Sequence, residues 1–357
     1  MKATEILHER GQSLWLDNIT RSLLDDGTVQ RYIDAYSVTG LTSNPSIFDK
    51  AVGSGYYDDA IREKAGQGLA LEDLFFALAI EDLRRAADLF LPVHERTDGV
   101  DGWVSLEVSP KLAYDTGKTV EAAKSLHERA GRRNLFIKIP GTKEGLPAIT
   151  EAVAAGVPIN VTLLFSADQY VAAAEAYLDG VERRISEGLD PAVGSVASVF
   201  MSRWDVAVAK QVPPDLRDQL ALAVGLDVYR AYRRLLASDR VQRAQNSGAR
   251  VQRLLWASTS TKDPGAPDTL YVHGLAAPFT INTMPNETLE AFYDHGEVGD
   301  ALPPDGGDAD EMLKEFANAG VDTGELAAQL QSDGAKSFVS AWDDLLDRIK
   351  GQCAAVA

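Results

Sequence analysis

Cysteine is almost absent from the sequence. The chain of 357 residues holds one, Cys353, and a lone cysteine forms neither a disulfide framework nor a metal site built on thiolates. We therefore expect a protein of a reducing compartment, the cytoplasm. Histidine is also scarce, and no two of the five are three or four residues apart in the sequence. A catalytic zinc site is therefore not expected.

Positive charge is in short supply. Lys and Arg total 35 against 53 Asp and Glu, which gives a net charge of -18. A field of that sign repels nucleic acid and anionic membrane surfaces, so neither is an expected partner, and an anionic substrate must meet a local cluster of cations. No run of eighteen apolar residues and no signal-peptide core occurs either, so we expect a soluble protein that is not exported.

Several motifs of other enzyme classes are missing. The sequence has no P-loop, no G-x-G-x-x-G fingerprint and no G-x-S-x-G elbow, so nucleotide binding and serine hydrolysis lose their usual support. Residues 303–310 are rich in acid and glycine but lack the alternating ligands of a calcium loop. We expect a solvated turn there, without a metal.

What the sequence does contain is an alternation of short apolar runs with longer amphipathic stretches. This alternation predicts an α/β fold with a parallel sheet, a (β/α)₈ TIM barrel of one domain over residues 1–357. A helical insertion is expected at about 45–100 and a C-terminal extension at about 286–357. The expected strands are 13–16, 37–41, 103–108, 135–139, 159–164, 194–200, 253–257 and 279–282. The expected helices include 71–91, 119–129, 167–185, 216–236 and 338–349.

Lys138 stands in the fourth run between Ile137 and Ile139. Burying an ammonium group is costly, and desolvation can lower a lysine pKa from about 10.4 toward roughly 7 to 8. The free amine that results attacks ketones, so Lys138 is a candidate Schiff-base nucleophile. The segment alone also allows a lysine whose stem is buried and whose amine reaches solvent.

Two acids, Asp17 and Glu107, follow apolar runs at the ends of different strands. The carboxyl ends of barrel strands face a common cavity, and two carboxylates beside Lys138 suffice to move protons around a carbinolamine. Asp17 could instead be the N-cap of the next helix. Glu107 needs a partner, because an acid that interrupts a buried strand is otherwise costly.

Uncharged polar residues cluster in two segments, 42–46 and 160–166. Their hydroxyl and amide groups are suited to binding sugar hydroxyls and one ordered water. A simple turn explains the first segment equally well, since Asn-Pro and Ser favour turns. An internal hydrogen bond of the sheet explains the second.

Cations follow the sixth and seventh runs. Arg203 could bind a phosphate through two parallel hydrogen bonds, or it could form a salt bridge with Asp205 or with another of the many acids. Residues 258–262 offer hydroxyls, backbone N–H groups and Lys262, which suits a phosphate site of the barrel type.

Taken together and in this order, these segments resemble the transaldolase family in its longer bacterial form. The likeness extends from about residue 13 to residue 285. The matching positions are Asp17, residues 42–46, Glu107, residues 137–140, residues 160–166 and residues 198–203.

The resemblance implies a class I aldolase barrel in which Lys138, on the fourth strand, forms a Schiff base. It also implies transfer of dihydroxyacetone from sedoheptulose 7-phosphate to glyceraldehyde 3-phosphate in the pentose phosphate pathway. Erythrose 4-phosphate and fructose 6-phosphate would result, without metal or organic cofactor. The implied catalytic partners of Lys138 are Asp17 as acid/base, and Glu107 and Thr162 as holders of a water. The implied substrate-binding residues are Asn44, Asn160 and Ser198 for dihydroxyacetone, and Arg203 and Ser258 for the phosphate. Thr42 is a further expected substrate-binding residue.

One departure and two alternatives remain at this stage. Many family members carry a second phosphate-binding arginine where Lys262 is the first cation here, and a lysine is a point charge rather than a fork. A fructose 6-phosphate aldolase is the nearest alternative, but in that branch glutamine replaces the acid at the Glu107 position. A barrel that only binds sugar phosphates is the other. Monomer and homodimer both remain open.

Overall fold

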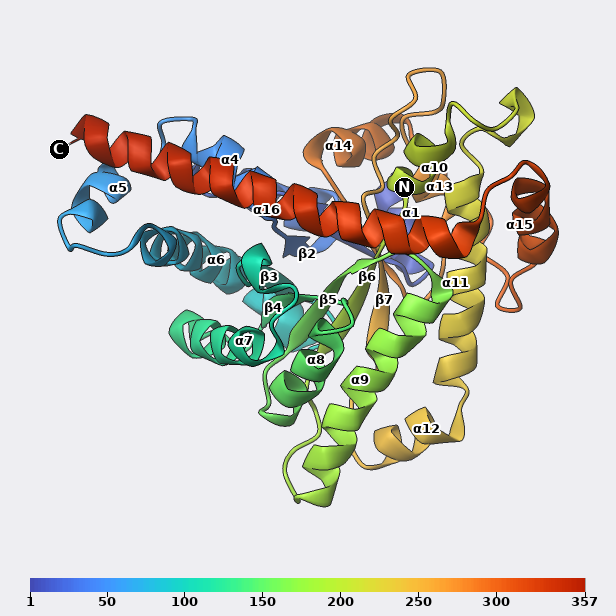
Figure 1. Ribbon diagram of the computed structural model, residues 1–357, viewed down its shortest axis with the longest axis horizontal. Coiled ribbons are helices and arrows are strands. Elements are labelled where there is room, and N and C mark those ends of the chain that lie inside the picture. Colours follow the sequence, from blue (N-terminus) through green and yellow to red (C-terminus); the bar gives the residue numbers. More distant parts are fainter. Residues whose placement is uncertain (357) are drawn as a thin grey trace.

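The computed structural model describes residues 1–356, and its centre is a closed barrel of eight parallel strands (Figure 1). Each strand pairs with its neighbours in chain order, and the last pairs with the first. The predicted (β/α)₈ barrel is therefore confirmed. The strands are β1 (Ser13–Asp17), β2 (Val38–Thr42), β3 (Trp103–Glu107), β4 (Leu135–Pro140), β5 (Ile159–Leu164), β6 (Ser195–Phe200), β7 (Gln252–Ala257) and β8 (Ile281–Met284).

Helices surround the barrel, and the described part of the chain contains sixteen α-helices and two 3₁₀ turns. The first ten are α1 (Ala3–Glu9), α2 (Arg21–Asp25), α3 (Thr28–Ala35), α4 (Pro45–Val52), α5 (Asp58–Ala65), α6 (Leu71–Arg96), α7 (Thr116–Ala130), α8 (Gly145–Ala154), α9 (Ala167–Ser186) and α10 (Ser202–Val208). The others are α11 (Leu220–Leu236), α12 (Asp239–Asn246), α13 (Leu270–Gly274), α14 (Asn286–His295), α15 (Ala309–Asn318) and α16 (Thr323–Val356). The 3₁₀ turns are Pro110–Leu112 and Pro214–Leu216.

Aromatic rings fill the amino-terminal half of the barrel. Phe136 stacks on Trp103 with ring centroids 4.0 Å apart and lies 6.2 Å from the ring of Trp15. Gly40 makes room for this packing, because a Cβ atom there would lie 2.5 Å from the Trp15 ring. Large buried rings fill the interior of the barrel at this end. Barrel enzymes place their active sites at the opposite end, where the strands have their carboxyl ends.

Many predicted element boundaries differ from those of the structure, and the predicted starts of β8 and α11 are wrong beside a left-handed residue. Strand β8 begins at Ile281 because Phe279 has a φ of +65° and is 62% exposed. Helix α11 begins at Leu220, after a 3₁₀ turn and Asp218, whose φ is +57°. The spacing of apolar residues carries no information about a left-handed backbone conformation. A prediction based on this spacing therefore continues the helix or strand through such a residue.

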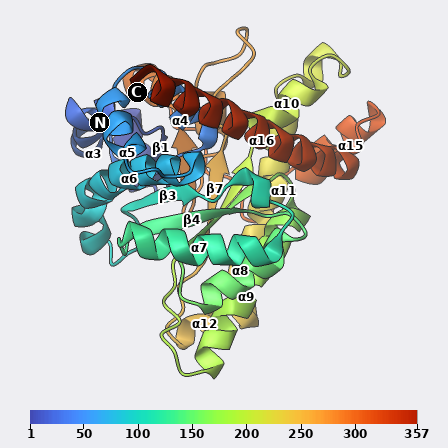
Figure 2. The ribbon, with the colours of Figure 1, turned by 60° about the vertical axis from the view of Figure 1, so that its left-hand side comes forward.

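The segment after Pro285 adds three helices, of which α16 is the longest. It crosses the carboxyl end of the barrel, as Figures 1 and 2 show, and packs against α4, α5, α6 and β5. The predicted helix 338–349 lies mostly in its second half, so the predicted helix is shorter than α16 at both ends. Among the described residues, no helix is both long and apolar enough to cross a membrane.

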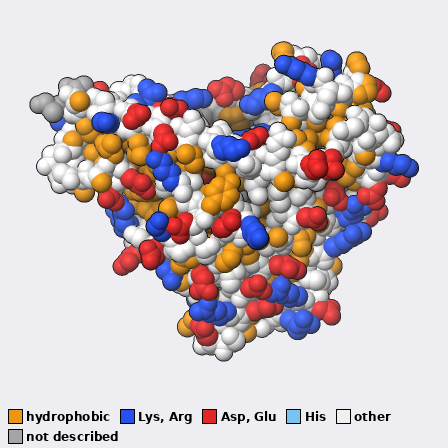
Figure 3. Space-filling view, in the orientation of Figure 1, with side chains coloured by type: hydrophobic (Ala, Val, Ile, Leu, Met, Phe, Trp, Pro, Cys, Tyr) orange, Lys and Arg blue, Asp and Glu red, His pale blue; other side chains and the backbone are white. Residues whose placement is uncertain are grey.

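The insertion between β2 and β3 carries α4, α5 and α6, so α16 lies over elements contributed by the insertion. Figure 3 shows acidic and basic side chains interspersed over the face in view. On this face the excess of acid is dispersed among cations rather than gathered into one patch.

Candidate active site

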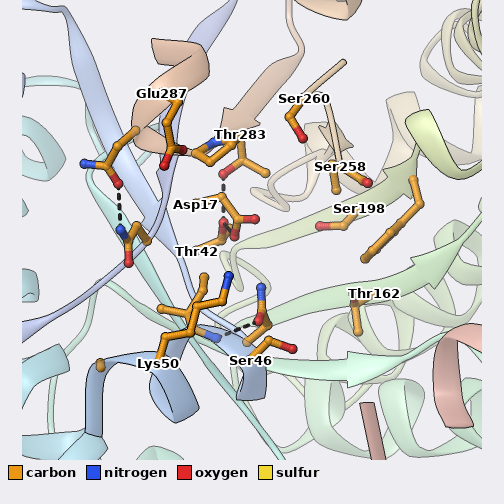
Figure 4. Close-up of a pocket in the computed structure, with 18 of the residues that line it drawn as sticks. Asp17, Thr42, Ser46, Lys50, Thr162, Ser198, Ser258, Ser260, Thr283 and Glu287 are labelled. Atoms are coloured by element: carbon orange, nitrogen blue, oxygen red, sulfur yellow. Dashed lines mark hydrogen bonds between the residues drawn. The ribbon is translucent and has the colours of Figure 1, made fainter. Parts of the chain in front are cut away.

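A pocket of about 480 Å³ opens at the carboxyl ends of the strands. Eight of the ten predicted site residues line it: Asp17, Thr42, Asn44, Lys138, Thr162, Ser198, Arg203 and Ser258. The other two contact lining residues, Glu107 through Lys138 and Asn160 through Ser198. In Figure 4, Ser258 and Ser260 lie on one side of Asp17 and Lys50 on the other. The parallel sheet thus gathers side chains that are far apart in the sequence.

Lys138 is buried at the base of this pocket. Its Nζ lies 3.2 Å from Glu107 Oε2 and donates a hydrogen bond of 3.1 Å to the carbonyl of Ser43. The side chain is 6% exposed. The alternative of an amine that reaches bulk solvent is therefore wrong.

Glu107 is the last residue of β3, and the sheet register aligns it with Lys138 on β4. Burial raises the pKa of this carboxyl, and the charge of Asp17 adds to the effect, while the positive charge of Lys138 opposes it. Apart from the ion pair, neither carboxylate oxygen has a hydrogen-bond partner among the described residues, and the same holds for Thr162 Oγ1. Buried polar atoms are costly when unsatisfied, so these oxygens suit a bound water or substrate.

Asp17, at the end of β1, is part of a hydroxyl network. Thr42 donates a 2.7 Å hydrogen bond to its carboxylate, and Thr283 lies 2.7 Å from Thr42 Oγ1. Burial raises the pKa of Asp17, although the charge of Lys138 and the Thr42 hydrogen bond oppose the shift. Asp17 is not the N-cap of α2, because Thr20 fills that position. The capping alternative is therefore wrong.

The amide side chains differ in how much of their hydrogen-bonding capacity the protein uses. Asn44 caps α4 by accepting from the Ile47 N–H at 3.1 Å, which leaves its amide nitrogen for a ligand. Asn160 donates to Ser105 at 3.1 Å and accepts from Ser198 at 2.7 Å. Asn160 thus makes the internal hydrogen bonds that the alternative reading expected, and its contact with a ligand stays a prediction.

Arg203 is the second residue of α10, the helix after β6, and it lines the pocket. Within the described chain it makes no ion pair and no hydrogen bond. Asp205 instead accepts hydrogen bonds from Tyr271 at 2.7 Å and from the Ala221 N–H at 3.2 Å. The predicted alternative of an Arg203–Asp205 salt bridge is therefore wrong. Burial lowers the pKa of this guanidinium, because removal from water disfavours its charged form. An anionic ligand would offset that cost.

Ser258, Ser260 and Lys262 stand beside Arg203 at the pocket wall. Ser258 shares a 2.8 Å hydrogen bond with Ser202, and Lys262 donates to Ser260 at 2.6 Å. Lys262 is exposed, so it offers a solvated charge at the rim.

Sequence reasoning missed several lining residues. Thr283 was overlooked because the predicted strand ended at Asn282; a correct boundary would have placed this hydroxyl at a strand end. Lys50 and Phe338 lie on α4 and α16 and also line the pocket. In the sequence they are an ordinary charge and an ordinary apolar residue of amphipathic helices, with no signal that points to a site. No group of three potential metal-ligating side chains occurs among the described residues.

The barrel, with polar groups converging at the carboxyl ends of its strands, has the arrangement of a barrel enzyme. A family model described as transaldolase/fructose-6-phosphate aldolase matches residues 14–349, and the chain belongs to this family. A transaldolase of Parafrankia sp. (strain EAN1pec) is 44% identical, and one of Thermobifida fusca (strain YX) is also 44% identical; each match covers 98% of both chains. A transaldolase of Acidothermus cellulolyticus is 44% identical over 95% of this chain and 94% of its own. The resemblance to the transaldolase family is confirmed.

Proposed function

We propose that the chain is a transaldolase, a transferase that moves dihydroxyacetone from sedoheptulose 7-phosphate to glyceraldehyde 3-phosphate. The products are erythrose 4-phosphate and fructose 6-phosphate, and the reaction belongs to the non-oxidative pentose phosphate pathway. The observation that carries this proposal is the buried amine of Lys138, 3.2 Å from Glu107 at the base of the pocket. The relatives named transaldolase support the choice of reaction.

The Lys138 amine attacks C2 of the ketose to form a carbinolamine, which loses water to give the Schiff base. Asp17 takes the proton of the C4 hydroxyl as the C3–C4 bond breaks and the aldose phosphate leaves. The bound enamine then attacks the aldehyde carbon of glyceraldehyde 3-phosphate, and Asp17 returns the proton to the new hydroxyl. Water hydrolyses the Schiff base and frees Lys138.

Glu107 and Thr162 hold the water that moves protons to and from the carbinolamine. Their buried oxygens, which lack hydrogen-bond partners among the described residues, support this role. The raised pKa of Glu107 favours proton exchange nearer neutral pH than an exposed carboxyl would allow.

The remaining residues bind the substrate. Thr42, Asn44, Asn160 and Ser198 hold the dihydroxyacetone moiety, and Arg203 with Ser258 holds the distal phosphate. The assignment of the phosphate to Arg203 is supported by the lack of any ion pair to this guanidinium in the described part of the chain. All these side chains belong to one chain, so the proposed chemistry needs no second copy, whether the protein is a monomer or a homodimer.

We also assign the enzyme to the cytoplasm, where sugar phosphates are its small-molecule substrates. The single Cys353 supports a reducing compartment. The acidic composition indicates that neither nucleic acid nor membrane lipid is a binding partner.

Borohydride reduction in the presence of fructose 6-phosphate tests the proposal. The expected result is a three-carbon adduct on Lys138, identified by intact mass and peptide mapping. Absence of this adduct would refute the Schiff-base mechanism and favour the alternative of a barrel that only binds sugar phosphates. Position 107 holds an acid and not glutamine, which favours transfer over release of free dihydroxyacetone. To test this preference, the transfer product and free dihydroxyacetone are quantified in the same preparation.

A further inference from the structure

One face of α16 looks down onto the pocket. Gln331, Gly334 and Phe338 are separated by three and four residues, so they share that face. Gln331 Nε2 donates to the carbonyls of Gly141 at 3.0 Å and Leu163 at 2.9 Å, at the ends of β4 and β5. The helix is thereby attached to the strand that carries Lys138 and to the next one.

Phe338 lies between the two functional cations. Its ring centroid is 5.8 Å from Lys138 Nζ and 5.9 Å from Arg203 Cζ. Phe200 contacts the same guanidinium at 5.1 Å. An aromatic face attracts a cation without consuming its N–H donors, whereas a carboxylate partner would occupy them. The two rings therefore hold Arg203 in place and leave its donors for an anion.

Gly334 lies one helical turn before Phe338, where the side chains of Leu163 and Arg203 leave little room for a Cβ atom. A Cβ atom there would lie 3.0 Å from Arg203 Nη1 and 2.9 Å from Leu163 Cδ2. Both atoms end flexible side chains, so an added methyl group would displace them rather than break the helix. The position of Arg203 thus depends on the absence of a side chain on α16.

We propose that the Gln331–Gly334–Phe338 face of α16 is a positioning element that holds Arg203 at a set separation from Lys138. Because the reacting carbon binds at Lys138 and the phosphate at Arg203, this separation sets which lengths of phosphorylated sugar fit. The C-terminal helix therefore determines specificity for the phosphorylated end without contributing a group to the chemistry. This inference rests on the proposed function.

Gly334→Ala tests the positioning role. The variant is expected to lower kcat/KM for glyceraldehyde 3-phosphate by about three- to tenfold, because the added methyl group displaces the Arg203 guanidinium by a few tenths of an ångström and so misplaces the phosphate partner. With unphosphorylated glyceraldehyde as acceptor, kcat/KM stays within about twofold of the parent value, since no phosphate is bound. Equal effects on both acceptors, or no effect on either, overturn the inference.

Gly351→Ala is the matched control. Gly351 lies on the same helix, and a Cβ atom there meets nothing within 4 Å. Both substitutions exchange a helical glycine for alanine and raise helix propensity alike. We expect the control to keep the parent preference for the phosphorylated acceptor. A control that loses the preference as Gly334→Ala does overturns the inference.

Phe338→Leu and Phe338→Tyr distinguish the effect of the aromatic ring from the effect of side-chain size. Leucine keeps an apolar side chain but removes the aromatic face, so KM for glyceraldehyde 3-phosphate is expected to rise. Tyrosine keeps the ring and is expected to retain most of the preference. A leucine variant that matches the parent overturns the role of the ring.

A last experiment distinguishes the proposed function from the positioning role of α16. The parent enzyme and Gly334→Ala are each treated with borohydride at saturating fructose 6-phosphate. An adduct on Lys138 in both, with acceptor preference lost only in the variant, supports both. An adduct in both with unchanged preference overturns the positioning role alone. No adduct in the parent overturns the proposed function.

Discussion

Strand β3 has a buried carboxylate near each end, and the two differ in how many hydrogen-bond partners the protein gives them. Asp101, two residues before the strand, accepts hydrogen bonds from Ser13 and from Trp15 Nε1, the latter at 2.7 Å. It also lies 3.7 Å from Arg253 Nη1. At the other end, Glu107 has the Lys138 amine, and its oxygens lack any further hydrogen-bond partner among the described residues.

The difference separates stability from function along one strand. At the amino-terminal end the protein satisfies its own buried charge, which closes the base of the barrel. At the carboxyl end it leaves bonding capacity unused, and burial raises the pKa of Glu107. Unsatisfied buried groups are costly, so they persist where a ligand or water completes them. In barrels that end is the catalytic face.

Lys138→Met gives the largest expected effect and tests the catalytic end directly. Removing the proposed nucleophile is expected to lower the rate of transfer on the order of 10⁴-fold or more and to abolish the borohydride adduct. A coupled assay of fructose 6-phosphate formation measures the rate. Lys118→Met, at a lysine side chain that is 70% exposed, is the control and should match the parent. A Lys138→Met variant that still formed the adduct would refute the assignment.

Glu107→Gln should lower the rate of transfer by roughly a hundredfold, a common size for a lost proton-transfer group. The fraction of free dihydroxyacetone released should rise, because glutamine is the residue expected at this position in the aldolase branch, which releases free dihydroxyacetone. Product analysis of a single reaction mixture measures both. An unchanged partition between transfer and release counts against the water-holding role.

Asp101→Asn should show the opposite pattern. Breaking a buried, satisfied pair is expected to lower the free energy of unfolding by about 3 kcal/mol. The value of kcat per folded molecule should stay within about twofold of the parent, since no substrate group lies there. Urea unfolding and active-site titration measure the two quantities. If Asp101→Asn lost activity without losing stability, the division of β3 would be wrong.

The pH dependence of stability sharpens the contrast further. The folded-state pKa of Glu107 is raised above 4.5, chiefly by burial, so ionisation penalises the folded state. The free energy of unfolding of the parent should therefore fall, relative to Glu107→Gln, as the pH rises from about 4.5 through the raised pKa. Below pH 4.5 the difference should level off. Urea unfolding across the pH range tests the sign, and a difference that shrank with rising pH would contradict it.

Lys262→Arg is expected to have the smallest effect. The lysine is solvated at the rim, and a planar fork could bind phosphate through two hydrogen bonds. KM for glyceraldehyde 3-phosphate should fall by about two- to threefold, with kcat unchanged, because exposed charges contribute little. Steady-state kinetics measure the shift. A large change in kcat would place Lys262 closer to the reaction than its exposure indicates.

Sequence patterns predicted the barrel and most of the pocket for a common reason. An acid or hydroxyl at the end of an apolar run, as at Asp17 or Glu107, marks both the strand and the face on which the side chain ends. Patterns failed where backbone conformation overrode composition, as at Phe279 and Asp218. They also left the state of Arg203 undecided, since the nearest acid in the sequence, Asp205, is bound to Tyr271 instead.

The sequence by itself determined the alternation of strands and helices, the family resemblance, and the lysine and acids at the strand ends, because these depend on local patterns. Only the tertiary structure decided that Lys138 is buried against Glu107, that Arg203 is unpaired within the described residues, and that α16 covers both. Contacts between residues that lie about 200 positions apart, such as Phe338 and Lys138, leave no local signal. They arise only when the barrel closes and the C-terminal helix packs across it.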